Sequence, residues 1–317
     1  MLYRKLQSLQ IIKIQLVTIV GLLLALWGCR ERVKDEIADF APVPVVNSFL
    51  VADSLIKVHV SLAGKLDSIP LGVVDGATVT CFVNDSLSEV LEPAGDGYYT
   101  GKAIARAGKI YRIEVNIPGF TEVTATDTIP WPVAPTRIEH VNLAAFNEEG
   151  QFFPAVRITF PVDQKMVHYF QVTLRLFQEE HSIQSEYHHI TYLIDFSDPV
   201  FLAEGMLIPV FSSDKIRDTI YTLQMNYGSP TVGWNEPNTT IRWAKYYPFV
   251  VDFKTISFQY YQYLKQLYLY NTGRYPEFQF GSYKAFPLFS NVSNGMGLVA
   301  GGAVFRSEVI TPEPWRR

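Results

Sequence analysis

Few residues of this chain have a type and spacing that fit known chemistry, and the clearest of them is Cys29. It directly follows Leu26-Trp27-Gly28, at the end of an apolar run over residues 14–27. A thiol in this position can form a diacylglyceryl thioether, and its amino group can take a further acyl chain once the preceding residues are cleaved off. Several acyl chains anchor a protein stably, whereas a single chain binds a membrane only reversibly.

The segment before Cys29 has the layout of a secretory signal peptide. Residues 1–28 combine a basic start, a short apolar core and a small residue before the cleavage position. A permanent transmembrane helix would need about 20 apolar residues, and Lys13 and Gln15 interrupt the run. The motif resembles a bacterial lipobox, with Trp27 as its departure from the usual pattern. We therefore expect residues 1–28 to be removed and Cys29 to begin a lipidated tether over residues 29–41.

The tether contains the triplet Lys34, Asp35 and Glu36. A lysine followed by acids near a lipidated cysteine resembles the export signal that takes Bacteroidetes-type lipoproteins to the outer face of the outer membrane. The alternative interpretation is a solvated linker, because charge runs usually remain in water. The sequence thus predicts an outer-membrane location, with the cell surface favoured over the periplasmic face.

A second recurring pattern joins Asp, then Ser or Thr, then an aliphatic residue. Composition predicts roughly one such tripeptide by chance. The pattern resembles the O-glycosylation sequon of Bacteroidetes exported proteins, although Asp-Ser and Asp-Thr also favour turns before strands. The hydroxyl residues that would carry glycans are Ser54, Ser68, Ser86, Thr128 and Thr219.

The remaining reactive side chains form no catalytic or metal-binding pattern. No His-Glu-x-x-His, Cys-x-x-Cys or Gly-x-Ser-x-Gly element occurs. His188 and His189 are neighbours in a predicted strand and would point to opposite faces, which does not suit a shared metal. Cys81 lies in a β-branched run and is expected to be a small buried hydrophobe. We expect no catalytic residue, metal or cofactor.

The elements that would position these residues are mostly strands. Residues 42–133 show period-two alternation with turn residues at regular intervals, which predicts about seven short strands and an immunoglobulin-like β-sandwich. Residues 134–317 are less regular and predict a β-rich C-terminal domain. It contains one amphipathic Tyr-rich helix near residues 255–272. The fold class is therefore mostly β.

The helix offers the only candidate contact residues in the second half. Tyr260, Tyr263 and Tyr270 lie along its predicted stripe, and aromatic side chains dominate interface energetics. Core packing with the hydroxyls at the rim is the alternative. The bulk composition is that of a folded protein, with 48% hydrophobic and 18% charged residues. A net charge of −4 disfavours nucleic acid as a partner.

Several short segments, in their order along the chain, resemble the Bacteroidetes lipoproteins grouped as domain of unknown function 4249. The resemblance implies an outer-membrane lipoprotein, often encoded beside a TonB-dependent transporter, and supplies no catalytic residues. The leading hypothesis is a non-catalytic accessory protein that captures a ligand for such a transporter or docks onto it. A surface adhesion or structural role is the alternative, and a surface hydrolase is less favoured. The segments are Val45–Leu50, Val74–Val79, Gly97–Tyr99, Gly108–Ile113, Phe258–Tyr268 and Ser290–Gly297.

Overall fold

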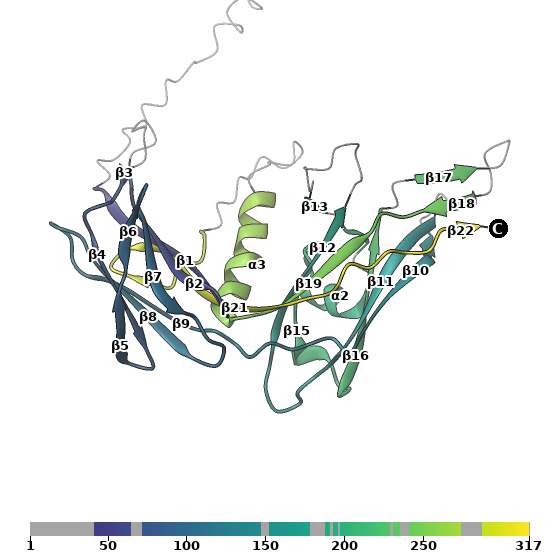
Figure 1. The fold of residues 1–317 in the computed structure, drawn as a ribbon, viewed down its shortest axis with the longest axis horizontal. Coiled ribbons are helices and arrows are strands. Elements are labelled where there is room, and N and C mark those ends of the chain that lie inside the picture. The colour runs from purple at the N-terminus through teal and green to yellow at the C-terminus, as the bar shows by residue number, and fades with distance from the viewer. Residues whose placement is uncertain are drawn as a thin grey trace, which may run out of the picture. The chain divides into compact units, whose positions relative to one another are not determined.

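Strands dominate the computed structural model of the protein (Figure 1). They account for 54% of the structure and helices for 12%, which confirms the predicted mostly β fold. The structure describes residues 41–64, 72–146, 152–177, 188–190, 193–195, 197–228, 231–234, 241–273 and 287–316. The predicted signal peptide, Cys29, the triplet at 34–36 and Ser68 lie outside these ranges.

The first part of the described chain forms a β-sandwich. In β1 and β2 the side chains alternate between buried and more exposed, so each strand presents one face to a core. One layer contains β1 (Val43–Val51), β2 (Leu55–Ala63), β3 (Gly72–Val73), β6 (Glu92–Gly95) and β7 (Tyr98–Ile104). The facing layer contains β4 (Thr78–Val83), β5 (Ser86–Val90), β8 (Ile110–Asn116) and β9 (Val123–Thr128).

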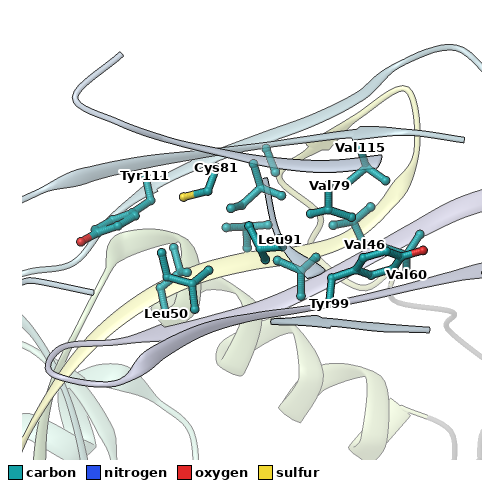
Figure 2. Packing of buried hydrophobic residues seen from close by; sticks show 14 of the residues in the cluster. Val46, Leu50, Val60, Val79, Cys81, Leu91, Tyr99, Tyr111 and Val115 are labelled. Atoms are coloured by element: carbon teal, nitrogen blue, oxygen red, sulfur yellow. The ribbon is translucent and has the colours of Figure 1, made fainter. Parts of the chain in front are cut away.

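The core of this sandwich is filled from both layers. Figure 2 shows Val46 and Leu50 of β1 together with Val79 and Cys81 of β4, all fully or almost fully buried. Tyr99 is also completely buried. Its hydroxyl donates to the Val74 carbonyl at 2.7 Å and accepts from the Ala77 amide at 2.9 Å, so the polar end of the ring is satisfied.

Two strands from much later in the chain complete the same sandwich. β20 (Val292–Ser293) pairs with β9, and β21 (Met296–Arg306) pairs in parallel with β1. Val299 of β21 is buried in the core described above. The predicted module at 42–133 therefore gains residues 292–302 in the structure.

The second half of β21 leads into another sandwich, because it pairs antiparallel with β19. The aromatic rings of Phe160, Phe170 and Phe253 pack at its centre, with centroid distances of 4.9–5.2 Å. One layer contains β12 (Tyr169–Phe177), β13 (His188–Ile190), β15 (Val210–Ser212), β19 (Phe249–Ile256) and β21. The other contains β10 (Arg137–Phe146), β11 (Phe152–Pro161), β14 (Leu193–Asp195) and β16 (Ile220–Tyr227).

A smaller sheet and three helices make up the rest of the described structure. The sheet contains β17 (Thr231–Trp234), β18 (Ile241–Lys245) and β22 (Trp315–Arg316). The helices are α2 (Pro199–Glu204), the 3-10 turn η1 (Ser213–Lys215) and α3 (Phe258–Gly273). None of the helices in these ranges combines the length and apolar composition that a membrane span requires.

The Tyr-rich helix predicted near 255–272 is α3, which begins three residues later. Thr255 and Ile256 finish β19 instead, where both are buried. Ser257 then starts the helix, since its hydroxyl accepts from the Tyr260 amide at 3.2 Å and its carbonyl accepts from the Tyr261 amide at 3.0 Å.

Candidate functional site

The candidate site is a groove of about 540 Å³ between α3 and the outer face of the first sandwich. Its floor follows from strand register. Asn47 of β1 pairs with Leu298 of β21 on one side and with His59 of β2 on the other, and His59 pairs in turn with Tyr98 of β7. Because paired residues point to the same side of a sheet, these four side chains form one row across the outer face.

Phe49 and Lys57 extend this floor. Each lies two positions from a member of the first row, and both are exposed on the same outer face. Phe49 has room because its neighbour Gly302 carries no side chain. A Cβ there would lie 3.0 Å from the ring carbon Cζ of Phe49. His59 and Tyr98 place their rings together, with centroids 4.7 Å apart.

Tyr260 and Tyr263 of α3 form the wall of the groove. The centroid of the Tyr260 ring lies 4.6 Å from that of the Phe49 ring. The Tyr263 ring is nearly parallel to the Tyr260 ring, with an interplanar angle of 11° and a centroid distance of 6.4 Å. Burial, together with Tyr263, raises the pKa of Tyr260 above its ordinary value. Tyr260 therefore stays a neutral phenol, and both tyrosines offer ring faces and hydroxyl groups.

A buried carboxylate holds α3 in place. Glu204, at the end of α2, accepts from the Tyr261 hydroxyl at 2.5 Å and from Lys265 Nζ at 2.8 Å. It also accepts from the Ser212 amide at 2.8 Å. Burial, with a contribution from Glu204, raises the pKa of Tyr261, which keeps this phenol a hydrogen-bond donor. The wall of the groove is thus fixed through Tyr261, one position after Tyr260, and through Lys265, two positions after Tyr263.

The charge of the groove has one sign. Lys57 and His59 are its titratable side chains besides the tyrosines, and no Asp or Glu is among the lining residues that the structure describes. Lys57 has no carboxylate partner within the described ranges. The Lys57 side chain therefore faces a mostly aromatic and amide-lined surface.

A second cavity, of about 490 Å³, lies where β9, β19 and α3 meet. Its apolar lining includes Trp131, which is 67% exposed, and Phe258. Asp127 is buried there and accepts from the Gly301 amide at 2.7 Å, with Ser257 as a further partner. Burial raises the pKa of Asp127 to about 6, since desolvation penalises the carboxylate more than these hydrogen bonds stabilise it.

The structure brings two of the three predicted tyrosines together. Tyr260 and Tyr263 line the groove, whereas Tyr270 is not among its lining residues. Sequence reasoning missed the residues of the floor, Phe49, Lys57 and His59. A signal for them was present, since the alternation in β1 and β2 places these positions on the outward face.

The predicted glycosylation residues within the described ranges are all exposed. Ser54 lies in the turn after β1 and Ser86 begins β5, while Thr128 ends β9 and Thr219 directly precedes β16. These residues are therefore accessible at the surface, as a glycan attachment site requires. Whether they carry glycans stays a prediction.

The described residues assemble no metal cluster. Cys81 is buried, and desolvation raises its pKa to about 12, so it packs as a small apolar group. Ser212 and Lys215 have a Ser-x-x-Lys spacing. Here the Ser212 hydroxyl donates to Asp214 at 2.6 Å, and Lys215 pairs with the same carboxylate at 3.2 Å, so no activated nucleophile results.

Taken together, these features define a mostly β protein of two joined sandwiches with an open aromatic groove. The sequence matches the family model described as Domain of unknown function (DUF4249) over residues 30–308. This match covers most of the chain, and the protein therefore belongs to that family. A comparison with curated proteins finds no match.

Proposed function

We propose that this protein is a non-catalytic, lipid-anchored accessory protein of the outer membrane that captures a ligand for a TonB-dependent transporter or docks onto it. The groove lined by Tyr260, Tyr263 and Phe49 carries this proposal. A concave, largely aromatic surface with a few polar groups is the usual form of a ligand site. Membership of the family supports the assignment, since the resemblance to its lipoproteins implies an outer-membrane setting.

The membrane attachment is proposed from the sequence. Cys29 follows a lipobox-like tetrapeptide and would carry the acyl chains, and Lys34, Asp35 and Glu36 would direct the protein to the cell surface. The exposed hydroxyls of Ser54, Ser86, Thr128 and Thr219 would be available for O-glycosylation.

The anchor is tested by substitution of the cysteine. In Cys29→Ala we expect the protein to leave the membrane fraction, because no thioether can form. Cys81→Ala is the matched control and should stay membrane-bound. Fractionation of cells and mass spectrometry of the N-terminal peptide provide the readout. Membrane retention of Cys29→Ala, with an unmodified peptide in the wild type, would rule out this anchor.

The transporter partnership is tested by crosslinking whole cells that produce the protein tagged after Arg317. Purification from the outer membrane should yield one TonB-dependent transporter in near-equal amount. Recovery of lipid and background proteins alone would argue against an accessory role.

A surface adhesion or structural role is the second candidate. It is favoured by the exposed apolar side chains around the second cavity, Trp131, Met166 and Phe258. Binding to matrix or to other cells without any effect on nutrient uptake would support this alternative.

A further inference from the structure

We propose that the groove beside α3 binds an acidic saccharide, with sugar rings against its aromatic side chains and a carboxylate of the sugar near Lys57. The inference rests on the proposed ligand-binding role of the groove and specifies the chemical class of the ligand.

The ring arrangement favours a sugar. The faces of aromatic rings carry partial negative charge and attract the weakly positive C–H groups of a pyranose. Tyr260 and Tyr263 are nearly parallel, and Phe49 lies 4.6 Å from Tyr260, so three rings lie in sequence along the groove. Tyr98, 50% exposed, extends this aromatic surface on the side of β7.

Polar groups between the rings can satisfy sugar hydroxyls. Asn47 accepts from the Leu298 amide at 3.2 Å through Oδ1, which orients its side chain and leaves the amide NH₂ as a donor. The hydroxyls of Tyr260 and Tyr263 both donate and accept. A purely apolar ligand would leave these groups without partners.

The charge of the groove selects an acidic ligand over a neutral one. Lys57 is exposed, and the described lining residues include no carboxylate to neutralise it. A uronic acid would supply that carboxylate on the same ring that stacks. The favourable pair is partly exposed, so its contribution is modest and decreases with salt.

The position of the groove disfavours an extended peptide. Its floor is the face of a sheet whose strands β21, β1, β2 and β7 are already paired with one another. A peptide strand adds to the free edge of a sheet, where backbone groups are unpaired, and that mode is not open here.

The test uses the full mature lipoprotein in detergent micelles and isothermal titration calorimetry. The probes are an oligogalacturonate and a neutral malto-oligosaccharide of equal length. We expect the oligogalacturonate to bind at least about tenfold more tightly. Tyr263→Ala should weaken its binding about tenfold, and Lys57→Gln should weaken it about three- to fivefold and thereby reduce the preference for the acidic sugar.

Matched controls are available on the same elements or surface. Tyr268→Ala changes a tyrosine of α3 that does not line the groove, and Lys109→Gln removes an exposed lysine elsewhere. Both should bind as the wild type does, and circular dichroism should show that all four variants are folded.

Three results would overturn the proposal. They are equal affinity for both probes, unchanged affinity in Tyr263→Ala and Lys57→Gln, and displacement of the sugar by an acidic peptide that binds more tightly. If neither sugar binds while a transporter still co-purifies, the acidic-saccharide inference fails and the proposed function stands. If a sugar binds but no transporter co-purifies, the saccharide class stands and the accessory role fails.

Discussion

Asp127 makes stability depend on pH through a single buried carboxyl group. Its pKa rises from 3.8 in the unfolded chain to about 6 in the folded protein. The protonated form is therefore favoured by folding. Its stabilising contribution is complete below about pH 4 and is lost as pH rises through about 6.

Asp127→Asn should remove this dependence. The amide oxygen can still accept from the Gly301 amide, and no charge has to be desolvated. We expect the variant to lose the Asp127 contribution to the pH slope, at most about 1.4 kcal/mol per pH unit between pH 4 and 6. It should also be more stable than the wild type at pH 7. Urea unfolding at several pH values provides the measurement, and an unchanged slope would contradict the assignment.

Gly297 shows how closely β21 approaches β1. Its φ is +117°, and a Cβ at this position would overlap the Val46 carbonyl, which belongs to backbone and cannot move aside. Gly297→Ala should lower the free energy of unfolding by about 3 kcal/mol or more. Gly76→Ala is the control, because a Cβ there meets nothing within 4 Å, and its effect should stay within about 1 kcal/mol in chemical denaturation.

At the level of elements, Glu204 connects α2 to α3 through two side chains of that helix. Glu204→Ala removes the acceptor of the Tyr261 hydroxyl and the carboxylate partner of Lys265 in a largely buried place. We expect a loss of about 2–4 kcal/mol. Amide hydrogen exchange should show α3 opening before global unfolding, and ligand binding in the groove should weaken with it.

An exposed ion pair provides the contrast. Glu92 and Lys102 are 66% and 79% exposed and form an ion pair at 2.6 Å. Glu92→Ala should leave the free energy of unfolding and the exchange in α3 nearly unaltered, because solvent screens an exposed pair. Equal effects of the two substitutions would show that Glu204 does not act as an anchor.

Most strands and the long helix could be predicted from local sequence patterns. Which strands pair with one another could not be predicted in this way. The alternation in β1 and β2 predicts strands and even identifies the outward positions of Phe49 and Lys57. It does not reveal that Leu298 pairs beside Asn47, because strand pairing depends on contacts distant in sequence. The helix boundary was displaced for a similar reason, since the tertiary environment of β19 outweighs the helical spacing at Thr255 and Ile256.

The groove was only half predictable for the same physical reason. Tyr260 and Tyr263 share a helical face and so could be singled out together. The floor comes from four strands whose register is set in three dimensions, and neither Lys57 nor His59 belongs to a motif. Sequence spacing identifies a wall of the site, while the fold supplies the surface opposite it.

At the scale of the whole molecule, the first sandwich depends on a strand that lies far along the chain. A fragment limited to residues 42–133 lacks both β20 and β21. The edge of β1 is then unpaired, and the core of the sandwich lacks the Val299 side chain. We expect it to show no cooperative unfolding transition. Fusion of residues 287–306 through a flexible linker should restore one, as measured by circular dichroism and amide NMR dispersion.

A fragment 42–133 that unfolds cooperatively without this addition would show that the paired strand contributes little. A fused segment that carries Gly297→Ala is the matched control, because it supplies the same residues with a strand that cannot approach β1. That fusion should remain as poorly ordered as the bare fragment.

The pairing of β1 with β21 also determines when the protein can become native during its synthesis. The Leu298 amide and the Asn47 side chain that it contacts are 251 positions apart. A ribosome makes the chain from the N-terminus onward, so β1 waits for its neighbour until about three hundred residues have been joined. Prematurely terminated chains therefore keep the edge of β1 unpaired, and chaperones and proteases can recognise such an edge. In this protein, the first sandwich can therefore be completed only after synthesis has passed β21.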